Sequence, residues 1–205
     1  MPVRVGLAAR LRSETADLHG ATEATVGIPD AVRTVDDYAM LLRSSRSFYA
    51  GAADALADAR WRQPWTRLGV RLEAHTRLAL IDDDLAALGQ TKPAIPPHRL
   101  ASGSFAEVLG LLYVVEGSAL GGHLIAPAIV AAIGPVPTSF YLGRGRDHPR
   151  PWRRVLSALA EFDRTEVETD PGLANEVVRG ARRAFLAFGE TVSSGAVAAA
   201  PGVTR

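Results

Sequence analysis

The sequence contains no cysteine. This absence excludes disulfide bonds, thiolate metal sites and a cysteine nucleophile. A cytoplasmic protein is our expectation from it. The first twelve residues also lack the apolar run that a secretory signal peptide needs, and they carry Arg4 and Arg10 instead.

Lysine is almost absent as well. Among 23 basic side chains only Lys92 is a lysine, so nearly every anion site must use arginine, whose planar fork matches carboxylates. The formal net charge is only +1. Such a balance gives no reason to expect a nucleic-acid partner.

No segment has the alternating pattern of a β-strand. Apolar residues instead recur at helical spacing through the 205 residues, and hydrophobic residues make up 47% of the chain, enough for one core. We predict an all-α, single-domain multi-helical bundle over residues 1–195 and a mobile tail at 196–205. The expected helices lie at about 3–24, 34–60, 68–88 and 105–134, then from about 151, and at about 171–192.

Local signals mark several helix ends. Thr34 is a good N-cap residue for the second helix, and acidic residues follow it in the first turn. Ser102 or Ser104 would cap the fourth helix. Proline between two tryptophans predicts a turn at 61–66.

The stretch 105–134 has helical composition but contains three interior glycines, Gly117, Gly121 and Gly122. Each costs a helix about 1 kcal/mol relative to alanine, so a compensating role is expected. A glycine lets a backbone lie against a flat ligand or another helix, because it has no Cβ. This helix could therefore cover a large planar cofactor.

Three other interpretations of this stretch remain open. No charged residue occurs between Glu116 and Arg144, and the Gly-x-x-x-Gly pattern is typical of membrane helices, although Pro127 interrupts the run. We do not expect a membrane protein, because no other segment looks membrane-spanning. The glycines could instead serve close helix packing in a soluble core. A helix could also end in a turn at Gly121-Gly122.

His19 lies beside the apolar stripe of the first helix, and Glu23 follows one turn later. Residues four apart share a helix face, so Glu23 can reach the imidazole. A carboxylate in that position is the usual partner of a metal-bound histidine. An ordinary histidine with one hydrogen bond is the alternative, and spacing alone favours it.

The run Asp82-Asp83-Asp84 invites comparison with a cation site. Consecutive helix residues point about 100° apart, so these carboxylates cannot readily converge on one ion. We interpret them as a solvated helix face.

Two motifs together resemble a known family. Residues 11–23, LRSETADLHGATE, resemble the first-helix signature of heme oxygenases, and residues 113–122, YVVEGSALGG, resemble their distal-helix signature in the bacterial form often paired with phytochromes. Residues 80–89 and the late helix around Phe185 fit as well. The resemblance covers about residues 7–192. It implies a helical bundle that holds haem between the first helix and a glycine-kinked distal helix.

The resemblance assigns roles to particular residues. His19 would be the proximal iron ligand, with Glu23 as its hydrogen-bond partner. Ser118 lies near the place where animal members carry an aspartate that organises distal water. The remaining assignments are Gly117, Gly121 and Gly122 as the distal backbone against the porphyrin, and Arg12, Tyr113 and Arg153 as propionate contacts.

The reaction that the resemblance implies uses haem as both cofactor and substrate, with biliverdin, carbon monoxide and ferrous iron as products. Glycine backbone above the porphyrin would direct dioxygen toward a meso carbon. Electrons must come from another protein, because Gly143-Arg144-Gly145 is only a lone Gly-x-Gly and no dinucleotide fingerprint is present. A ferredoxin, a flavodoxin or a reductase would supply them, and a phytochrome is a candidate receiver of the bilin.

Two other functions stay open. A non-catalytic haem carrier or sensor would use the same His19. A haem-free helical domain, such as a small-molecule hydrolase, would need a nucleophile or a carboxylate cluster in a pocket, and the sequence offers no convincing one.

Overall fold

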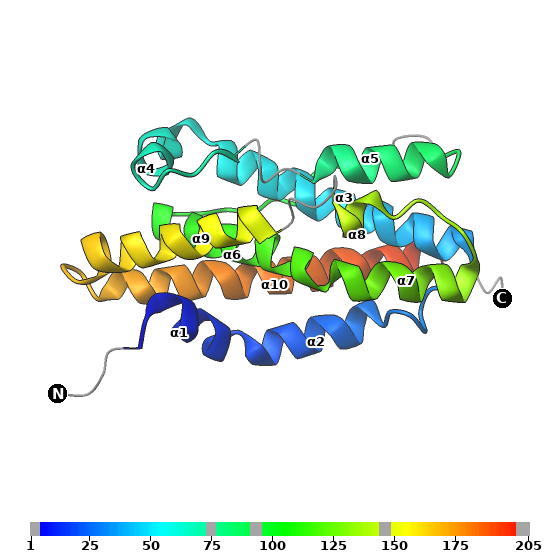
Figure 1. The fold of residues 1–205 in the computed structure, drawn as a ribbon, viewed down its shortest axis with the longest axis horizontal. Coiled ribbons are helices and arrows are strands. Elements are labelled where there is room, and N and C mark those ends of the chain that lie inside the picture. Colours follow the sequence, from blue (N-terminus) through cyan, green and yellow to red (C-terminus); the bar gives the residue numbers. More distant parts are fainter. Residues whose placement is uncertain (1–4, 73–76, 91–95, 144–148, 200–205) are drawn as a thin grey trace.

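The computed structural model describes residues 5–72, 77–90, 96–143 and 149–199 (Figure 1). These residues form helices and connecting turns without a β-strand, so the predicted all-α class is confirmed. The elements are α1 (Leu7–Glu14), α2 (Ala16–Val26), α3 (Val35–Ala57), η1 (Ala59–Trp61), α4 (Arg62–Arg67), α5 (Leu78–Ala87), α6 (Phe105–Gly117), η3 (Ser118–Gly121), α7 (Gly122–Ile133), α8 (Ser139–Leu142), α9 (Pro149–Phe162), η4 (Asp163–Val167, one π-helical turn) and α10 (Gly172–Ala199).

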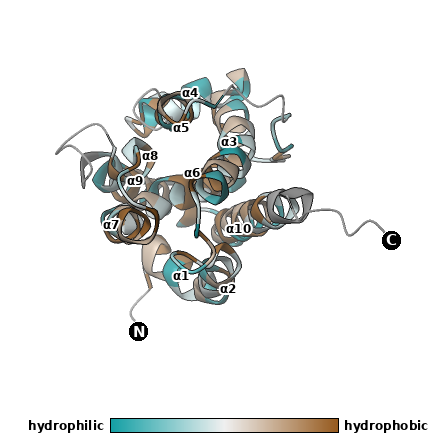
Figure 2. Cartoon of the chain, turned by 90° about the vertical axis from the view of Figure 1, so that its right-hand side faces the viewer, coloured by the Kyte–Doolittle hydropathy of each residue, from teal (hydrophilic) through white to brown (hydrophobic). Residues whose placement is uncertain are grey.

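Helices α6 and α10 form the centre of the bundle. In Figure 1, α1 and α2 lie on one side of them, and α3, α4 and α5 lie on the other. Figure 2, turned by 90°, shows α6 surrounded by α3, α7, α9 and α10, with α1 and α2 below. Helix α10 packs against α6, α3, α2 and α1. It therefore joins the two sides of the molecule.

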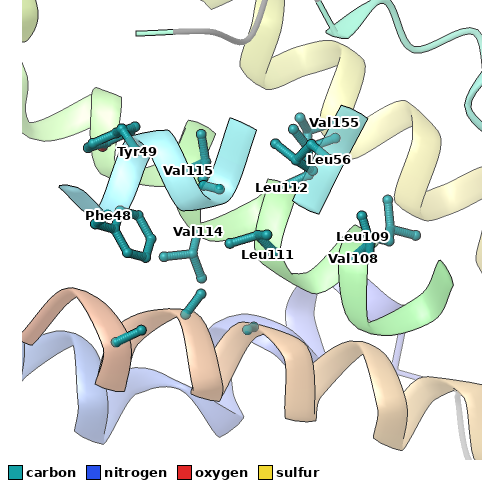
Figure 3. Close-up of a cluster of buried hydrophobic side chains, with 14 of the residues drawn as sticks. Phe48, Tyr49, Leu56, Val108, Leu109, Leu111, Leu112, Val114, Val115 and Val155 are labelled. Atoms are coloured by element: carbon teal, nitrogen blue, oxygen red, sulfur yellow. The ribbon is translucent and has the colours of Figure 1, made fainter. Parts of the chain in front are cut away.

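The hydrophobic core lies where α3, α6 and α9 meet (Figure 3). Leu112 and Val115 of α6 are buried there with Leu56 of α3 and Val155 of α9. Burying a side chain of this size stabilises a fold by about 1.5–3 kcal/mol. The apolar content of α6 thus serves the interior of the bundle.

The predicted cap at Thr34 is confirmed. Its hydroxyl accepts a hydrogen bond from the Asp37 amide at 3.1 Å, and the Asp37 carboxylate accepts one from the Thr34 amide at 2.9 Å. This reciprocal pair satisfies two amides at the helix start. For α6 the cap is Ser104 and not Ser102, since Ser104 Oγ accepts from the Glu107 amide.

Three predicted boundaries are corrected. The first helix, expected as one element, is divided at Thr15, whose hydroxyl donates to the Leu11 carbonyl at 2.8 Å. The turn expected at 61–66 is helical, because the indole of buried Trp65 donates to the Leu56 carbonyl and holds α4 against α3. The helix expected from 68 begins only at Leu78, after a left-handed Gly69 ends α4.

The boundary expected at residue 195 falls within α10, which continues to Ala199. Residues 200–205 of the expected tail lie outside the described part of the chain, and so do residues 144–148, between the fourth and fifth expected helices.

Asp84 does not belong to a solvated face, which corrects our interpretation. Asp84 is only 1% exposed. Its carboxylate accepts hydrogen bonds from the amides of Ser139 and Phe140 at 2.9 and 2.8 Å. A carboxylate is favourable there because these amides begin α8. Asp82 pairs separately with Arg46 at 2.6 Å. The aspartates thus point to different partners, as the cation-site argument required.

Helices α6 and α10 approach each other closely at two glycines. A Cβ on Gly110 would lie 2.0 Å from the Val177 carbonyl oxygen, and one on Gly180 would lie 2.0 Å from the Glu107 carbonyl oxygen. Backbone on both sides leaves no flexible side chain to move aside. The two glycines are therefore what allows the helices to pack at this distance.

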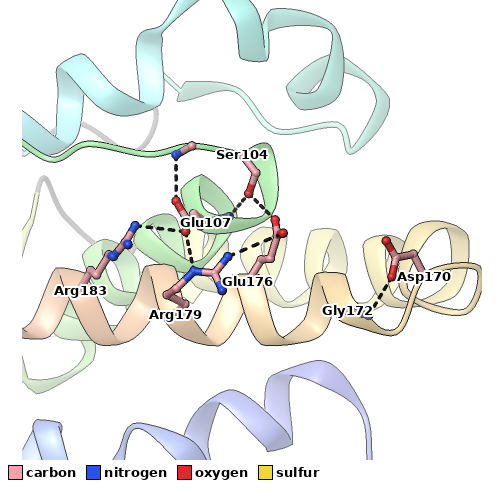
Figure 4. A network of polar contacts seen from close by, with 8 residues as sticks. Ser104, Glu107, Asp170, Gly172, Glu176, Arg179 and Arg183 are labelled. Carbon is pink, nitrogen blue, oxygen red and sulfur yellow. Dashed lines mark hydrogen bonds and ion pairs between the residues drawn. The ribbon is translucent and has the colours of Figure 1, made fainter.

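A buried carboxylate lies at the start of the same interface (Figure 4). The Glu107 side chain is 6% exposed and accepts hydrogen bonds from Arg179 at 2.7 Å, Arg183 at 3.1 Å and the Gly103 amide at 2.8 Å. Burial by itself raises the pKa of Glu107, but these donors and positive charges outweigh it and hold the pKa below its usual value.

The continuous helical stretch Phe105–Ile133 is long and apolar enough to cross a membrane by length and composition. More than half of its most apolar window is buried inside the bundle. A core helix of a soluble protein has these properties, and the burial favours this interpretation.

Candidate functional site

His19 lies on an exposed face of α2. Its side chain is 57% exposed, Glu23 Oε1 is 3.5 Å from Nδ1, and the ring meets Phe185 of α10 edge to face at 5.7 Å. Helix α2 has no buried residue. The imidazole is therefore accessible, with a carboxylate beside one nitrogen.

The helical stretch that carries the three glycines, from α6 to α7, changes its winding there. The chain passes from α6 into the 3₁₀ turn η3 and directly on into α7, so Gly121-Gly122 does not end a helix. The winding tightens instead over Ser118–Gly121. Such a 3₁₀ segment inside a longer helix often marks a functional hinge or a sequence under strain.

The three glycines of this stretch differ in what surrounds them. A Cβ on Gly122 would lie 2.0 Å from the Tyr141 carbonyl oxygen, so close packing on α8 accounts for this buried glycine. A Cβ on Gly121 would meet only the end of Ile125 at 3.7 Å, and one on Gly117 would meet Trp152 at 3.5 Å. Both are ordinary contacts. The fold does not require glycine at 117 and 121, and both positions are partly exposed.

Ser118 is exposed on η3 and is joined to the core through Tyr49 of α3. The Ser118 hydroxyl donates to the Val115 carbonyl at 2.9 Å, and its oxygen lies 2.8 Å from the Tyr49 hydroxyl. Serine has one hydroxyl proton, so Tyr49 is the donor of the second bond. Burial raises the pKa of Tyr49, which keeps that proton in place.

Large apolar side chains are exposed on the elements around His19 and η3. Leu124 of α7 is 70% exposed, and Leu120 of η3 and Leu186 of α10 are also exposed. Leu186 follows Phe185, the aromatic neighbour of His19. An apolar ligand that covers these side chains would remove them from water.

Of the three expected propionate contacts, Arg12 and Tyr113 lie near each other, and among the described residues no hydrogen bond or ion pair joins Arg153 to them. Tyr113 is half-buried and packs on Trp152 at 5.3 Å. Burial raises the pKa of Tyr113, and the charge of Arg12 acts in the opposite direction, so Arg12 is close enough to interact with it. Arg12 and Arg153 are both exposed, on α1 and α9.

Sequence reasoning missed Tyr49, Trp152 and Arg182 as residues of this region. Tyr49 lies in an apolar stripe of α3 and Trp152 in one of α9, so their patterns indicate only core positions. Their roles depend on elements distant in the chain. No local signal could have identified them.

The described residues also form a cavity of about 490 Å³ between α3 and α4, lined by Leu56, Trp65, Arg77 and others. It does not include His19. No cluster of three or more metal-binding side chains occurs within the described ranges. The described side chains alone would therefore not hold a metal ion at His19.

Comparison with known proteins gives one sequence relative and a closely similar structure. No family model matches the chain. A protein named heme oxygenase from Xanthomonas campestris pv. campestris (strain 8004) is 33% identical over 128 residues, which cover 62% of this chain and 73% of that protein. The NO- and CO-bound heme oxygenase from Neisseria meningitidis superposes with a TM-score of 0.71 at 20% identity, over 97% of this chain and 96% of that chain.

The chain belongs to the heme oxygenase family. The structural likeness extends over nearly all of the chain and shows that the bundle has the fold of the Neisseria protein. The family resemblance carried by residues 11–23 and 113–122 is thus confirmed, and the protein is an enzyme.

Proposed function

We propose that this enzyme cleaves haem with dioxygen to biliverdin, carbon monoxide and ferrous iron, and that His19 is the iron ligand. The observation that carries the proposal is the accessible imidazole on α2, in a family member whose η3 segment has a partly exposed glycine at position 121. Both features leave room for a flat ligand.

The residues present fit haem as the bound group. Haem would supply a redox-active iron and the porphyrin that is cleaved. The four porphyrin nitrogens already bind the iron, so the protein needs to supply only one or two further ligands. One exposed imidazole is therefore sufficient, in agreement with the lack of a larger cluster among the described residues. Glu23 is placed to accept the second ring N–H and to hold the neutral imidazole in one orientation.

On the distal side we assign Gly117 and Gly121 to the backbone that faces the porphyrin. Ser118 would position distal water. Its hydroxyl proton is committed to Val115 and one lone pair to Tyr49, so its remaining lone pair accepts from water. Gly122 holds η3 against Tyr141 instead.

We assign Arg12, Tyr113 and Arg153 to the haem propionates. The interaction between Arg12 and Tyr113 supports a shared region at one edge of the site. Arginine suits this role because its guanidinium forms two parallel hydrogen bonds with a carboxylate.

Electrons would come from a ferredoxin, a flavodoxin or a reductase. We further propose that the enzyme is cytoplasmic and that a phytochrome receives its bilin. The absence of cysteine supports the location, and the distal motif supports the link to phytochromes.

Titration with hemin, followed by ascorbate or a ferredoxin system in air, tests the proposal. We expect a Soret band that decays while the broad red absorption of biliverdin grows. His19→Ala should turn over little unless imidazole is supplied. A stable ferrous–dioxygen adduct under reductant would instead indicate a haem carrier or sensor, and failure to develop a Soret band would refute haem binding.

A pair of alanine variants tests the distal assignment. Gly121→Ala should leave the haem-free protein as stable as the wild type, because its Cβ meets only Ile125 at 3.7 Å, yet it should slow haem turnover. Gly189→Ala, where nothing lies within 4 Å of the Cβ, is the matched control for stability and should be neutral or stabilise by up to about 1 kcal/mol. Unchanged turnover in Gly121→Ala would contradict contact between Gly121 and the porphyrin.

A further inference from the structure

Helix α2 carries the proposed iron ligand but has little packing to hold it. None of its residues is buried, and it packs mainly on α10. It is also separated from α1 at Thr15, where the backbone leaves helical geometry (φ −119°, ψ 2°). Val26 at its far end packs against the core, but at its start neither a buried residue nor a continuous helix fixes the direction of α2.

Arg182 of α10 spans this break. Its Nη1 donates to the Glu14 carbonyl at 2.6 Å, at the end of α1, and to Asp17 Oδ1 at 2.9 Å, in the first turn of α2. Its Nη2 donates to Asp17 Oδ2 at 3.0 Å. One guanidinium thus binds both helices that meet at Thr15.

The same face of α10 meets His19. Phe185 lies three residues after Arg182, one helical turn further, and contacts the imidazole edge to face at 5.7 Å. Asp17 precedes His19 by two residues. Two successive contacts, Arg182 with Asp17 and Phe185 with His19, therefore set α2 against α10.

We propose that Arg182 is a positioning residue, which fixes the direction of α2 and the orientation of the His19 imidazole through Glu14 and Asp17. The proposal rests on the proposed role of His19 as the iron ligand. Arg182 itself touches neither His19 nor, in our assignment, the porphyrin.

The geometry supports a positioning role better than a stabilising one. Asp17 and Arg182 are both exposed to a large extent, and exposed ion pairs contribute little to overall stability. Two parallel hydrogen bonds from a rigid guanidinium nevertheless restrict direction, which a single lysine contact cannot do. Loss of Arg182 should loosen α2 without unfolding the bundle.

The first experiment uses the haem-free protein and measures amide hydrogen exchange over residues 16–26. We expect Arg182→Gln to speed exchange there about tenfold while the melting temperature falls by less than about 4 °C. Arg182→Lys should give an intermediate rate. Arg164→Gln removes a matched bidentate pair, with Glu161, that does not contact α2, and should leave exchange in α2 unchanged.

The second experiment adds hemin, reduces it to ferrous haem, and measures the iron–imidazole stretching band of this complex by resonance Raman spectroscopy. We expect Arg182→Gln to shift or broaden this band and Asp17→Asn to do so less, because Asp17→Asn leaves the bond of Arg182 to the Glu14 carbonyl in place. The double variant should match Arg182→Gln, since Arg182→Gln already removes both contacts. Arg164→Gln should reproduce the wild-type band.

Unchanged exchange in α2 of Arg182→Gln would overturn the proposal, and so would an unchanged band in a complex that retains His19 ligation. If the wild-type complex has no iron–imidazole band, the proposed function fails on the ligand. The exchange measurement in the haem-free protein then still decides whether Arg182 fixes α2.

Discussion

Helix α10 has two very different interfaces. Toward α6 it approaches at backbone distance through Gly110 and Gly180, and Glu107 is buried against its arginines. Toward α2 it offers Phe185 and the exposed guanidinium of Arg182, and α2 buries no residue at all. One helix thus has a closely packed partner and a loosely attached one.

The comparison separates an interface that the protein packs closely by itself, between α6 and α10, from one that it packs only loosely, between α2 and α10. Close packing fixes α6 against α10 through Gly110 and Gly180. The α2 side combines an accessible imidazole with the exposed apolar side chain of Leu186. If haem binds on that side, as we propose, the α2–α10 interface becomes fully packed only in the haem complex.

The largest expected effect comes from breaking the close interface. Gly180→Ala places a Cβ 2.0 Å from the Glu107 carbonyl oxygen, and the helices must separate to admit it. We expect a loss of about 3 kcal/mol in the free energy of unfolding, measured by urea denaturation. Gly189→Ala on the same helix should be neutral or stabilise by up to about 1 kcal/mol. Equal behaviour of the two variants would remove the contrast.

The charged part of the same interface should give a smaller effect. Glu107→Gln removes the acceptor charge for Arg179 and Arg183 and should cost about 2 kcal/mol at pH 7. Because the folded pKa of Glu107 lies below its unfolded value, its stabilisation is present above about pH 4.5 and is lost as the pH falls through the folded pKa. The wild type should therefore lose more stability than Glu107→Gln between pH 5 and pH 3. Parallel pH profiles would contradict the pairing.

The hydrogen bond between Tyr49 of α3 and Ser118 of η3 should contribute less. Tyr49→Phe deletes one hydrogen bond to η3 while Ser118 keeps its bond to the Val115 carbonyl. We expect a loss of about 1 kcal/mol in thermal unfolding and a slower haem turnover, since Ser118 then lacks its donor. Ser118→Ala should slow turnover similarly, and normal turnover in both variants would exclude this pair from the reaction.

The smallest effect is expected on the loose side. His19→Ala should change the free energy of unfolding of the haem-free protein by less than about 0.5 kcal/mol, because the side chain is 57% exposed. Hemin should raise the melting temperature of the wild type more than that of the variant, since a ligand stabilises the state that binds it. A large destabilisation without haem would show that His19 is structural.

The sequence was sufficient for the features that depend on neighbours in the chain. The cap at Thr34 and the apolar stripes of α3, α6 and α10 follow from residues within a few turns. The pairing of His19 with Glu23 across one helical turn has the same origin, and their separation in the structure is 3.5 Å. Two family motifs then indicated the bundle as a whole.

Features that depend on distant backbone could not be predicted. Asp84 is buried because the amides of Ser139 and Phe140 reach it, and Gly122 is required by the carbonyl of Tyr141. The break at Thr15 likewise involves Arg182, far along the chain. In each case the local residues are compatible with another outcome, and a tertiary contact decides.

The position of α10 also has a consequence for how the protein is made. Among the described helices, α1 and α2 leave the ribosome before the others, while α10 follows every other described helix. Chains fold as they emerge, and contacts between distant segments form slowly. The nascent α2 lacks its main packing partner until α10 is synthesised. The α2–α10 interface therefore forms only after all the other described helices have been made, and in our proposal haem binding through His19 depends on this late contact.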